Sequence, residues 1–332
     1  LAFSIFWLFL YVFINLTSVA WLGALAIEQI LGLKGAVIMI GSASISVRLL
    51  IIILLYLVAG VYSIYGGLAS VAWTDVMQVV FLVGGGLITA YAALKVLAPH
   101  LGADGAIGAL GQVMDRLGDI PGDKHFNLVV ERQPELFGNI TEDPYFTLPG
   151  IVLIVGALWL TNLGYWGFNQ YIIQKGLAAK NIDEAKKGLV FAGFLKILIP
   201  FIVCIPGVCA YLIWNDKSLA DAIGLAPGSN ITISDDAYPF LIRNFTPVVV
   251  KGLSFAALTA AVISSLASMF NSTSTIFTMD IYHTFINKEA SDKKLVGVGR
   301  ITAIAALIIA LIAVYPIMGG ADQAFQIIQE YS

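Results

Sequence analysis

Long apolar blocks, separated by short polar segments, follow one another along the whole chain. Seven of them reach the length of about 20 residues that crosses the hydrocarbon core of a bilayer. We expect these spans at about 1–27, 36–64, 73–98, 149–172, 188–213, 248–280 and 296–318, and the start of an eighth near Asp322. Lipid offers backbone groups no hydrogen-bond partner, and the blocks are too long and uniformly apolar for barrel strands. The pattern therefore predicts an all-α membrane protein.

The composition agrees with this prediction. The chain is 59% hydrophobic and 12% charged, with a mean hydropathy of +0.89, whereas an ordinary soluble domain carries about a quarter charged residues. Too few polar side chains remain to cover a soluble surface, so a soluble fold is excluded. The formal net charge of −3 is small and indicates no nucleic-acid partner.

The chain begins at Leu1 inside an apolar run and ends at Ser332, soon after the eighth segment begins. We expect residues 1–332 to form a single transmembrane domain that is a fragment of a longer protein. The first block has no basic n-region and no small-residue cleavage pattern, so we do not interpret it as a signal peptide.

Basic residues between the blocks predict the orientation, because cytoplasmic loops carry an excess of Lys and Arg. Two loops on the same side hold the basic residues Lys175, Lys180, Lys186, Lys187, Lys288, Lys293, Lys294 and Arg300. This predicts cytoplasmic loops at about 65–72, 173–187 and 281–295, and outward loops at about 99–148 and 214–247. Lys34 and Arg48, near a short outer loop, argue against the assignment but are outnumbered.

One lysine lies well inside a span. Lys196 is about nine residues into the fifth block, where an uncompensated charge costs about 3 kcal/mol or more. Snorkelling to the interface is the alternative, and it is difficult from this depth. We expect Lys196 to face a cavity, where its three donors suit a polyhydroxyl ligand or a carboxylate.

The fourth block concentrates amides, aromatic residues and glycines: Asn162, Gly164, Tyr165, Trp166, Gly167, Asn169 and Gln170. In an intact helix, Asn162, Tyr165 and Asn169 would share one face, since they are spaced i, i+3 and i+7. The glycine pair also permits an unwound helix whose free backbone groups coordinate ions and substrates. We expect a ligand site, and aromatic residues next to amides suit a sugar. An interfacial aromatic belt is the alternative.

The sixth block carries hydroxyls on an otherwise apolar helix: Ser264, Ser265, Ser268, Ser272, Thr273, Ser274 and Thr275. Small-residue packing explains most of them, yet a hydroxyl pair with nearby carbonyls also suits Na⁺. Asp75 begins the third block, where the helix dipole favours a carboxylate, and this does not exclude a role in an ion exit path. Asn15, in mid-span, fits helix packing and ligand contact equally well. Phe325 and Gln329 are four residues apart and so share a helix face.

We find no sign of an enzyme. The motifs H-E-x-x-H, G-x-S-x-G and the P-loop are absent from the sequence, and no nucleotide domain for an ATP-driven pump is present. The histidines His100, His125 and His283 all lie outside the span interiors. Cys204 and Cys209 lie in an apolar block and are interpreted as small buried hydrophobes.

Five stretches resemble the sodium/solute symporter family, most of all its bacterial sodium/galactose members. They are FINLTSV (13–19), YSIYGGLASVAWTDVMQVVFLV (62–83), NLGYWGFNQYIIQKGLAAKN (162–181), FAALTAAVISSLASMFNSTSTIFTMDIY (255–282) and DQAFQIIQEY (322–331). The resemblance implies a leucine-transporter-type inverted-repeat helical bundle. The seven spans would be core helices three to nine of ten, followed by the start of the tenth.

The resemblance also implies roles for single residues. Ala261, Ser264 and Ser265 match sodium-site positions, and Asp75 matches an acid on the sodium exit route. The positions matching sugar-binding partners are Asn15, Asn162, Lys196 and Gln329. Tyr165 matches an inner gate with Trp166 beside it, and Phe325 matches part of an outer gate.

By this resemblance the chain is a secondary active transporter of a bacterial inner (plasma) membrane, coupling inward Na⁺ movement to uptake of a neutral hexose. The alternatives are a family member carrying inositol, sialic acid, proline or an anion, and, from another class, a channel or a membrane sensor. The expected partners are a sugar, Na⁺ and the lipid bilayer, while the oligomeric state stays open, a dimer included. Departures from the family leave the sugar undecided. The tyrosine usual before the gate is Gly164, and the segments 28–60 and 98–148 look longer than in the galactose symporters.

Overall fold

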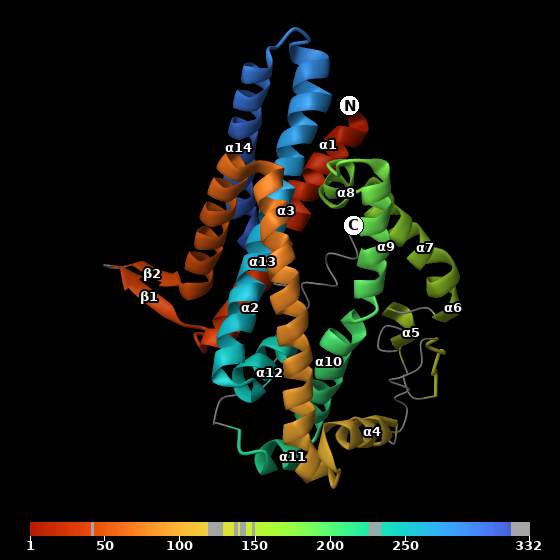
Figure 1. The fold of residues 1–332 in the computed structure, drawn as a ribbon. Coiled ribbons are helices and arrows are strands. Elements are labelled where there is room, and N and C mark those ends of the chain that lie inside the picture. The colour runs from red at the N-terminus through yellow and green to blue at the C-terminus, as the bar shows by residue number, and fades with distance from the viewer. Residues whose placement is uncertain are drawn as a thin grey trace. The chain divides into compact units, whose positions relative to one another are not determined.

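The computed structural model describes residues 1–40, 43–118, 129–135, 139, 144–147, 150–225, 231 and 234–319 (Figure 1). Within these residues seven helices are long and apolar enough to cross a membrane. They are Ala2–Leu31, Val47–Gly67, Val71–Leu101, Gly150–Phe168, Ile182–Asn215, Val248–Ile286 and Asp292–Met318. The prediction of a polytopic α-helical protein with seven spans is therefore confirmed.

The start of the second predicted span is wrong. Residues expected to be helical form an antiparallel hairpin of β1 (Val37–Ile40) and β2 (Ala43–Ser46), with Val37 opposite Ser46 and Ile40 opposite Ala43. Three of the four residues of β1 are Val or Ile, and these side chains pack well on a pleated strand. The apolar run alone could not separate this short hairpin from the helix that follows it.

The helix α3 (Val47–Leu97) consists of two helices joined at a kink. Gly67 has φ 56° and ψ −165°, a backbone conformation that only glycine adopts without strain. The kink lies in the segment 65–72, where the sequence predicts a loop between two spans. Two membrane-length helices, Val47–Gly67 and Val71–Leu101, therefore follow each other with almost no connecting loop.

The chain divides into two compact units, which are described separately. Unit 1 comprises Leu1–Ala93, Ile197–Trp214 and Gly224–Ser332, and unit 2 comprises Leu94–Lys196 and Asn215–Ile223. Whether residues 1–332 form one transmembrane domain stays a prediction.

The core of unit 1 is built by helices from distant parts of the sequence. Its elements beyond α3 and the hairpin are α1 (Ala2–Phe9), η1 (Leu10–Asn15), α2 (Leu16–Leu31), α10 (Ile199–Asn215), η5 (Ser234–Asp236), α12 (Ala237–Phe245), α13 (Val248–Thr275), η6 (Ile276–Ile286) and α14 (Asp292–Met318). The helices α2, α13 and α14 pack against one another (Figure 1). Tyr56 and Phe270 are fully buried, and the Tyr56 hydroxyl donates to the Leu16 carbonyl at 3.1 Å. Such a bond satisfies the hydroxyl of a buried aromatic ring.

Unit 2 consists mainly of short, interrupted helices. They are η2 (Ala98–Leu101), α4 (Gly105–Gly118), α5 (Pro144–Thr147), α6 (Gly150–Val152), η3 (Leu153–Ala157), α7 (Leu158–Leu163), η4 (Gly164–Phe168), α8 (Gln170–Leu177), α9 (Ile182–Lys196) and α11 (Lys217–Ala222). Asp216 caps α11 by accepting from the Leu219 backbone N–H at 3.0 Å. The Ser218 hydroxyl and this N–H both stabilise the carboxylate, so they lower the pKa of Asp216.

The fifth span is interrupted in its middle. The helix α9 ends at Lys196, and α10 begins at Ile199, two turn residues later. Pro200 contributes to this break, because proline has no N–H to donate to the Lys196 carbonyl four residues earlier and its ring clashes with that carbonyl. Lys196 is the fifteenth residue of the span Ile182–Asn215 of 34 residues, so it lies near the middle, as its position in the apolar block predicts.

Candidate functional site

Two of the residues implicated in ion binding meet directly in unit 1. The Ser264 hydroxyl, on α13, donates a hydrogen bond to the Asp75 carboxylate, in the second helix of α3. These residues are 189 positions apart in the sequence, and Ser264 is 3% exposed. Asp75 lies near the N-terminus of its helix, where the dipole stabilises its negative charge.

The neighbouring residues add to an oxygen-rich environment. Ala261, Ser264 and Ser265 are spaced i, i+3 and i+4 on α13, so they lie on one face of the helix. Ala261, Ser265 and Asp75 are half-buried. A carboxylate with two serine hydroxyls supplies the oxygens that a hard cation prefers, and its negative charge offsets that of the ion. Such a set of oxygens suits a monovalent cation such as Na⁺, and the assignment of this face to a sodium site stays a prediction.

In unit 2 the mid-span lysine lies over an aromatic ring. The Lys196 ammonium, at the end of α9, is 4.3 Å from the centre of the Trp166 ring, on η4. This is a cation–π distance, and such a contact gives about 0.5–1 kcal/mol at an exposed site. Tyr165 packs edge-on against Trp166 with ring centroids 5.2 Å apart. A basic donor and two aromatic rings are thus gathered on neighbouring helices, a combination that suits a sugar.

The fourth span is broken four residues after the predicted gate. The π-helix η4 (Gly164–Phe168) is followed by Asn169, whose backbone is extended with φ −81° and ψ 112°, and α8 begins at Gln170. The amphipathic face expected of an intact helix is therefore interrupted, because Asn169 is buried while Asn162 and Tyr165 are exposed. The Tyr165 hydroxyl instead hydrogen-bonds the Tyr171 hydroxyl across the break, at 2.8 Å.

The remaining sugar-binding candidates are less closely associated. The Asn162 side-chain amide donates to the Leu158 carbonyl of its own helix at 2.7 Å. Asn15 ends the π-helix η1 in unit 1, where it is half-buried, whereas Asn162 and Lys196 belong to unit 2. Gln329 and the gate candidate Phe325 lie outside the described residues. The described part of unit 2 thus brings together Lys196, Trp166 and Tyr165, and the other assignments stay predictions.

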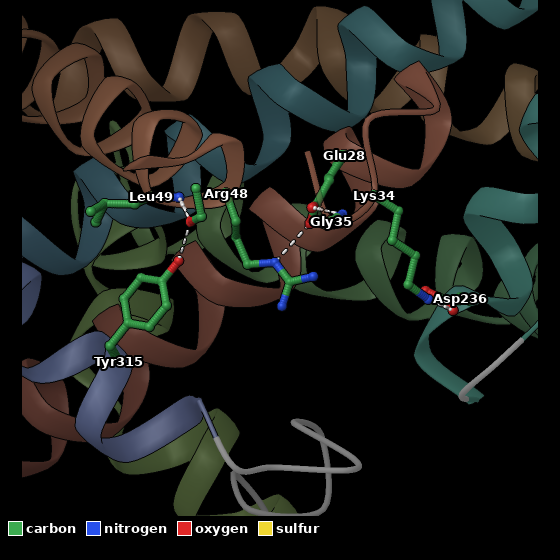
Figure 2. A network of polar contacts seen from close by, with 8 residues as sticks. Glu28, Lys34, Gly35, Arg48, Leu49, Asp236 and Tyr315 are labelled. Atoms are coloured by element: carbon green, nitrogen blue, oxygen red, sulfur yellow. Dashed lines mark hydrogen bonds and ion pairs between the residues drawn. The ribbon is translucent and has the colours of Figure 1, made fainter. Parts of the chain in front are cut away.

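A second polar network in unit 1 was not predicted from the sequence (Figure 2). Glu28, 2% exposed at the end of α2, accepts from the Arg48 Nε at 2.7 Å and from the Gly35 backbone N–H at 2.8 Å. The Arg48 guanidinium lies 4.8 Å from the centre of the Trp21 ring. Lys34, close by, forms an ion pair with the buried Asp236. The block boundary at residue 27 hid this network, because it left Glu28 in the loop.

The same region is also tied to the last span. The Tyr315 hydroxyl of α14 and the Ser46 hydroxyl are 2.7 Å apart, and the Leu49 backbone N–H donates to Ser46 at 3.1 Å (Figure 2). The Trp21 and Tyr315 rings pack edge-on with centroids 5.3 Å apart. The network therefore holds α2, the end of the hairpin and α14 together.

Replacing Glu28 with alanine is expected to lower the free energy of unfolding by about 3 kcal/mol, because a largely buried Arg48 would lose its counter-ion. The matched control is Glu184→Ala. Glu184 pairs with Lys187 at 2.9 Å on an exposed helix face, and such a pair contributes about 0.5 kcal/mol or less. Thermal unfolding in detergent measures both variants. Equal melting temperatures for the two would contradict a stabilising role of the Glu28 network.

Comparisons with known proteins show which proteins the chain is similar to. Residues 1–331 match the family model described as the sodium:solute symporter family. A sodium/glucose cotransporter of Vibrio parahaemolyticus is 48% identical over 99% of this chain and 55% of its own length. Sodium/glucose cotransporter 1 of Sus scrofa is 33% identical over 98% of this chain and 47% of its own length. Sodium/myo-inositol cotransporter 2 of Mus musculus is 32% identical over 93% of this chain and 43% of its own length.

A solved structure shares the fold. It is a substrate-bound, outward-open Na⁺-coupled sialic acid symporter, which matches with a TM-score of 0.70 at 21% identity. The match covers 96% of this chain and 58% of that one. The predicted transporter-type helical bundle is thereby confirmed. The chain spans about half the length of the curated relatives it matches.

Proposed function

Because the chain belongs to the sodium:solute symporter family, we propose that it carries part of a transporter that couples inward Na⁺ movement to uptake of a neutral hexose. The observation that carries the proposal is the hydrogen bond between Ser264 and Asp75. It joins two residues that the family resemblance assigns separately to a sodium site and to a sodium exit route. The sodium/glucose cotransporters among the relatives support the choice of ion and solute.

In this proposal Na⁺ binds on the face of α13 formed by Ala261, Ser264 and Ser265. The Ala261 carbonyl and the two hydroxyls supply neutral oxygens, and Asp75 supplies a nearby negative charge. A serine hydroxyl binds a cation through the lone pairs of its oxygen, so Ser264 can donate its hydrogen to the Asp75 carboxylate and bind the ion at the same time. The hydrogen bond to Asp75 orients the Ser264 oxygen and makes it more negative, so ion binding and the Ser264–Asp75 bond are coupled. Asp75 then takes over the ion as it leaves.

The sugar binds where Lys196 and the aromatic rings of the fourth span converge. The ammonium donates to sugar hydroxyls, and the rings offer a flat apolar surface to the less polar face of the sugar. Tyr165 closes the site from the inside with Trp166 beside it. The family resemblance further assigns Asn15, Asn162 and Gln329 to hydrogen bonds with the sugar and Phe325 to the outer gate, and these assignments are part of the proposal.

We propose the orientation that the basic loops predict, with 65–72, 173–187 and 281–295 cytoplasmic and 99–148 and 214–247 outward. The two basic residues that argue against it are both paired: Arg48 with Glu28, and Lys34 with Asp236. The second pair also joins the segment after α2 to the segment 214–247, which this orientation places on the same side.

The proposed energy source is the sodium gradient. A membrane potential of 100 mV supplies about 2.3 kcal/mol per charge moved, and a concentration difference adds to this. Coupling requires Na⁺ to bind more tightly to the outward-open state, because a ligand shifts an equilibrium only by its differential affinity for the two states. Loss of Na⁺ to the inside then loosens the inner gate and releases the sugar.

Inositol is the second candidate solute. A sodium/myo-inositol cotransporter is 32% identical to this chain, and a cyclic polyol offers hydroxyls to Lys196 much as a hexose does. Competition of unlabelled galactose, glucose, myo-inositol, sialic acid and proline against radiolabelled galactose separates these candidates. The proposal requires a hexose to compete best.

Uptake of radiolabelled galactose or glucose by the complete transporter in liposomes is expected to fall at least about tenfold when Na⁺ is replaced by K⁺, because the gradient is the only energy source present. Vesicles without protein provide the background. Unchanged uptake in K⁺ would refute the coupling. Electrical recording on the same vesicles tests the channel alternative, since a channel would conduct Na⁺ with no solute added.

A further inference from the structure

A cavity of about 360 Å³ lies in unit 1, and none of the described residues assigned above to Na⁺ or sugar lines it. It is formed by the end of the first helix of α3, the end of α13 with η6, and the beginning of α14. Its polar lining consists of Ser63, Asn271, Ser274, Thr275, Thr278 and Arg300. Its apolar lining includes Met279 and Val296, which are 45% and 56% exposed. The cavity therefore has a polar side and an open apolar side.

Two buried polar groups in this lining have no hydrogen-bond partner among the described residues. Asn271 accepts the Ser63 hydroxyl on its Oδ1 at 2.9 Å, and this orients its buried Nδ2, which is unpaired. Thr278 is 5% exposed, and its Oγ1 is also unpaired. A buried polar group that is left without a partner destabilises the protein. Both groups can donate, so a bound acceptor would satisfy them.

The helix α14 approaches this polar lining closely at Gly299. A Cβ on Gly299 would lie 2.7 Å from the Ser274 Oγ and 3.5 Å from the Thr278 Oγ1, so a side chain at this position would crowd both hydroxyls. The next residue, Arg300, also lines the cavity and is exposed. Among the described residues that form the lining, none contributes a carboxylate. Its charge and free donors thus favour an anion over a cation.

The cavity lies at a depth that suits a lipid head group. The span Val248–Ile286 has 39 residues, or about 58 Å of helix, nearly twice the hydrocarbon thickness, so its ends extend beyond the apolar core. Thr278 is eight residues before the end of this span, and Arg300 is eight residues after the start of α14. The connection from η6 into the first turn of α14 carries Lys288, Lys293 and Lys294. In the orientation proposed above, on which this step rests, the connection is cytoplasmic, and basic pockets between helices on the cytoplasmic side bind anionic head groups.

We propose that this cavity binds the phosphate of an anionic phospholipid. The phosphate oxygens accept from Arg300, the Asn271 amide and the Thr278 hydroxyl, while an acyl chain runs past Met279 and Val296 to the surrounding lipid. Free inorganic phosphate presents the same oxygens without the acyl chain. A zwitterionic lipid carries an ammonium for which the described lining has no carboxylate.

Native mass spectrometry of the purified complete protein tests the site, with phosphatidylglycerol and phosphatidylethanolamine as probes. Phosphatidylglycerol is expected to bind at least about fivefold more tightly, because a lysine or arginine near an anionic head group contributes about 1 kcal/mol. Arg300→Gln should lower its affinity by about fivefold, and Thr278→Val, which removes only the hydroxyl, by about threefold. The matched control is Lys293→Gln, a basic residue of the same connection outside the lining, which should change affinity by less than about twofold.

Three outcomes decide the matter. Equal binding of the two lipids, or equal effects of Arg300→Gln and Lys293→Gln, would overturn the proposal. Competition by millimolar inorganic phosphate, lost in Arg300→Gln, would support a phosphate site and assign it to the free anion rather than to a lipid. Unchanged melting temperatures of the variants are required in each case, and a Thr278→Val variant that unfolds is replaced by Thr278→Ser, which should retain binding.

Discussion

Replacing Lys196 with glutamine is expected to lower sugar uptake by about 10- to 100-fold at low sugar concentration. A hydrogen bond from a charged donor contributes about 1.5–3 kcal/mol, and 1.4 kcal/mol is a factor of ten in affinity. Glutamine keeps a donor but loses the charge, and it is too short to preserve the 4.3 Å contact of the ammonium with the Trp166 ring. The main change should be in the apparent KM for the sugar.

The matched control for this experiment lies on the same helix. Lys187 is on α9, is exposed and pairs with Glu184, so Lys187→Gln removes an identical charge from outside the proposed site. We expect it to alter uptake by less than about twofold, as is usual for an exposed pair. Trp166→Phe tests the ring separately, since it keeps an aromatic face with weaker attraction for the ammonium. A normal KM in Lys196→Gln would remove this residue from the sugar site.

The apolar blocks predict most of the fold because seven of them are longer than any strand and contain few charges. The apolar pattern wrongly predicted a helix at residues 37–46, because Val and Ile in an apolar run fit a hairpin as well as a helix. The pattern also gave no sign that the first helix continues to Leu31 and carries the buried Glu28 in its last turn. Its partner Arg48 is 20 residues away, on the far side of the hairpin, and local periodicity cannot predict such a pairing.

The sequence likewise predicts some features of the candidate site and not others. Lys196 was identifiable from the sequence alone, because a charge in the middle of an apolar block must have a physical reason. The break at Asn169 was not identifiable from the sequence. The glycine pair Gly164 and Gly167 suggested that the helix unwinds some residues earlier, whereas the residue with extended backbone is Asn169. The Ser264–Asp75 hydrogen bond spans 189 positions, and only the family resemblance gave a reason to consider the two residues together.

Replacing Asp75 with asparagine is expected to raise the Na⁺ concentration for half-maximal uptake at least about tenfold. Two unit charges 5 Å apart at an effective dielectric constant of about 20 attract by about 3 kcal/mol, and half of this is already a tenfold effect. Asparagine retains an oxygen that can accept from Ser264, so the fold should persist and the change should report the lost charge. The uptake assay in liposomes measures it as a function of Na⁺ at saturating sugar.

A carboxylate elsewhere in unit 1 provides the control for this result. Asp280, on η6, accepts from the Ser4 hydroxyl at 3.3 Å, and Asp280→Asn removes the same charge from outside the proposed ion site. Its Na⁺ dependence should match the unaltered protein within about twofold. A double-mutant cycle with Ser264→Ala then measures the coupling between Asp75 and Ser264, which for two residues in contact is about 0.5–3 kcal/mol. Additive effects, or equal shifts for Asp75→Asn and Asp280→Asn, would show that the Ser264–Asp75 contact has no part in ion binding.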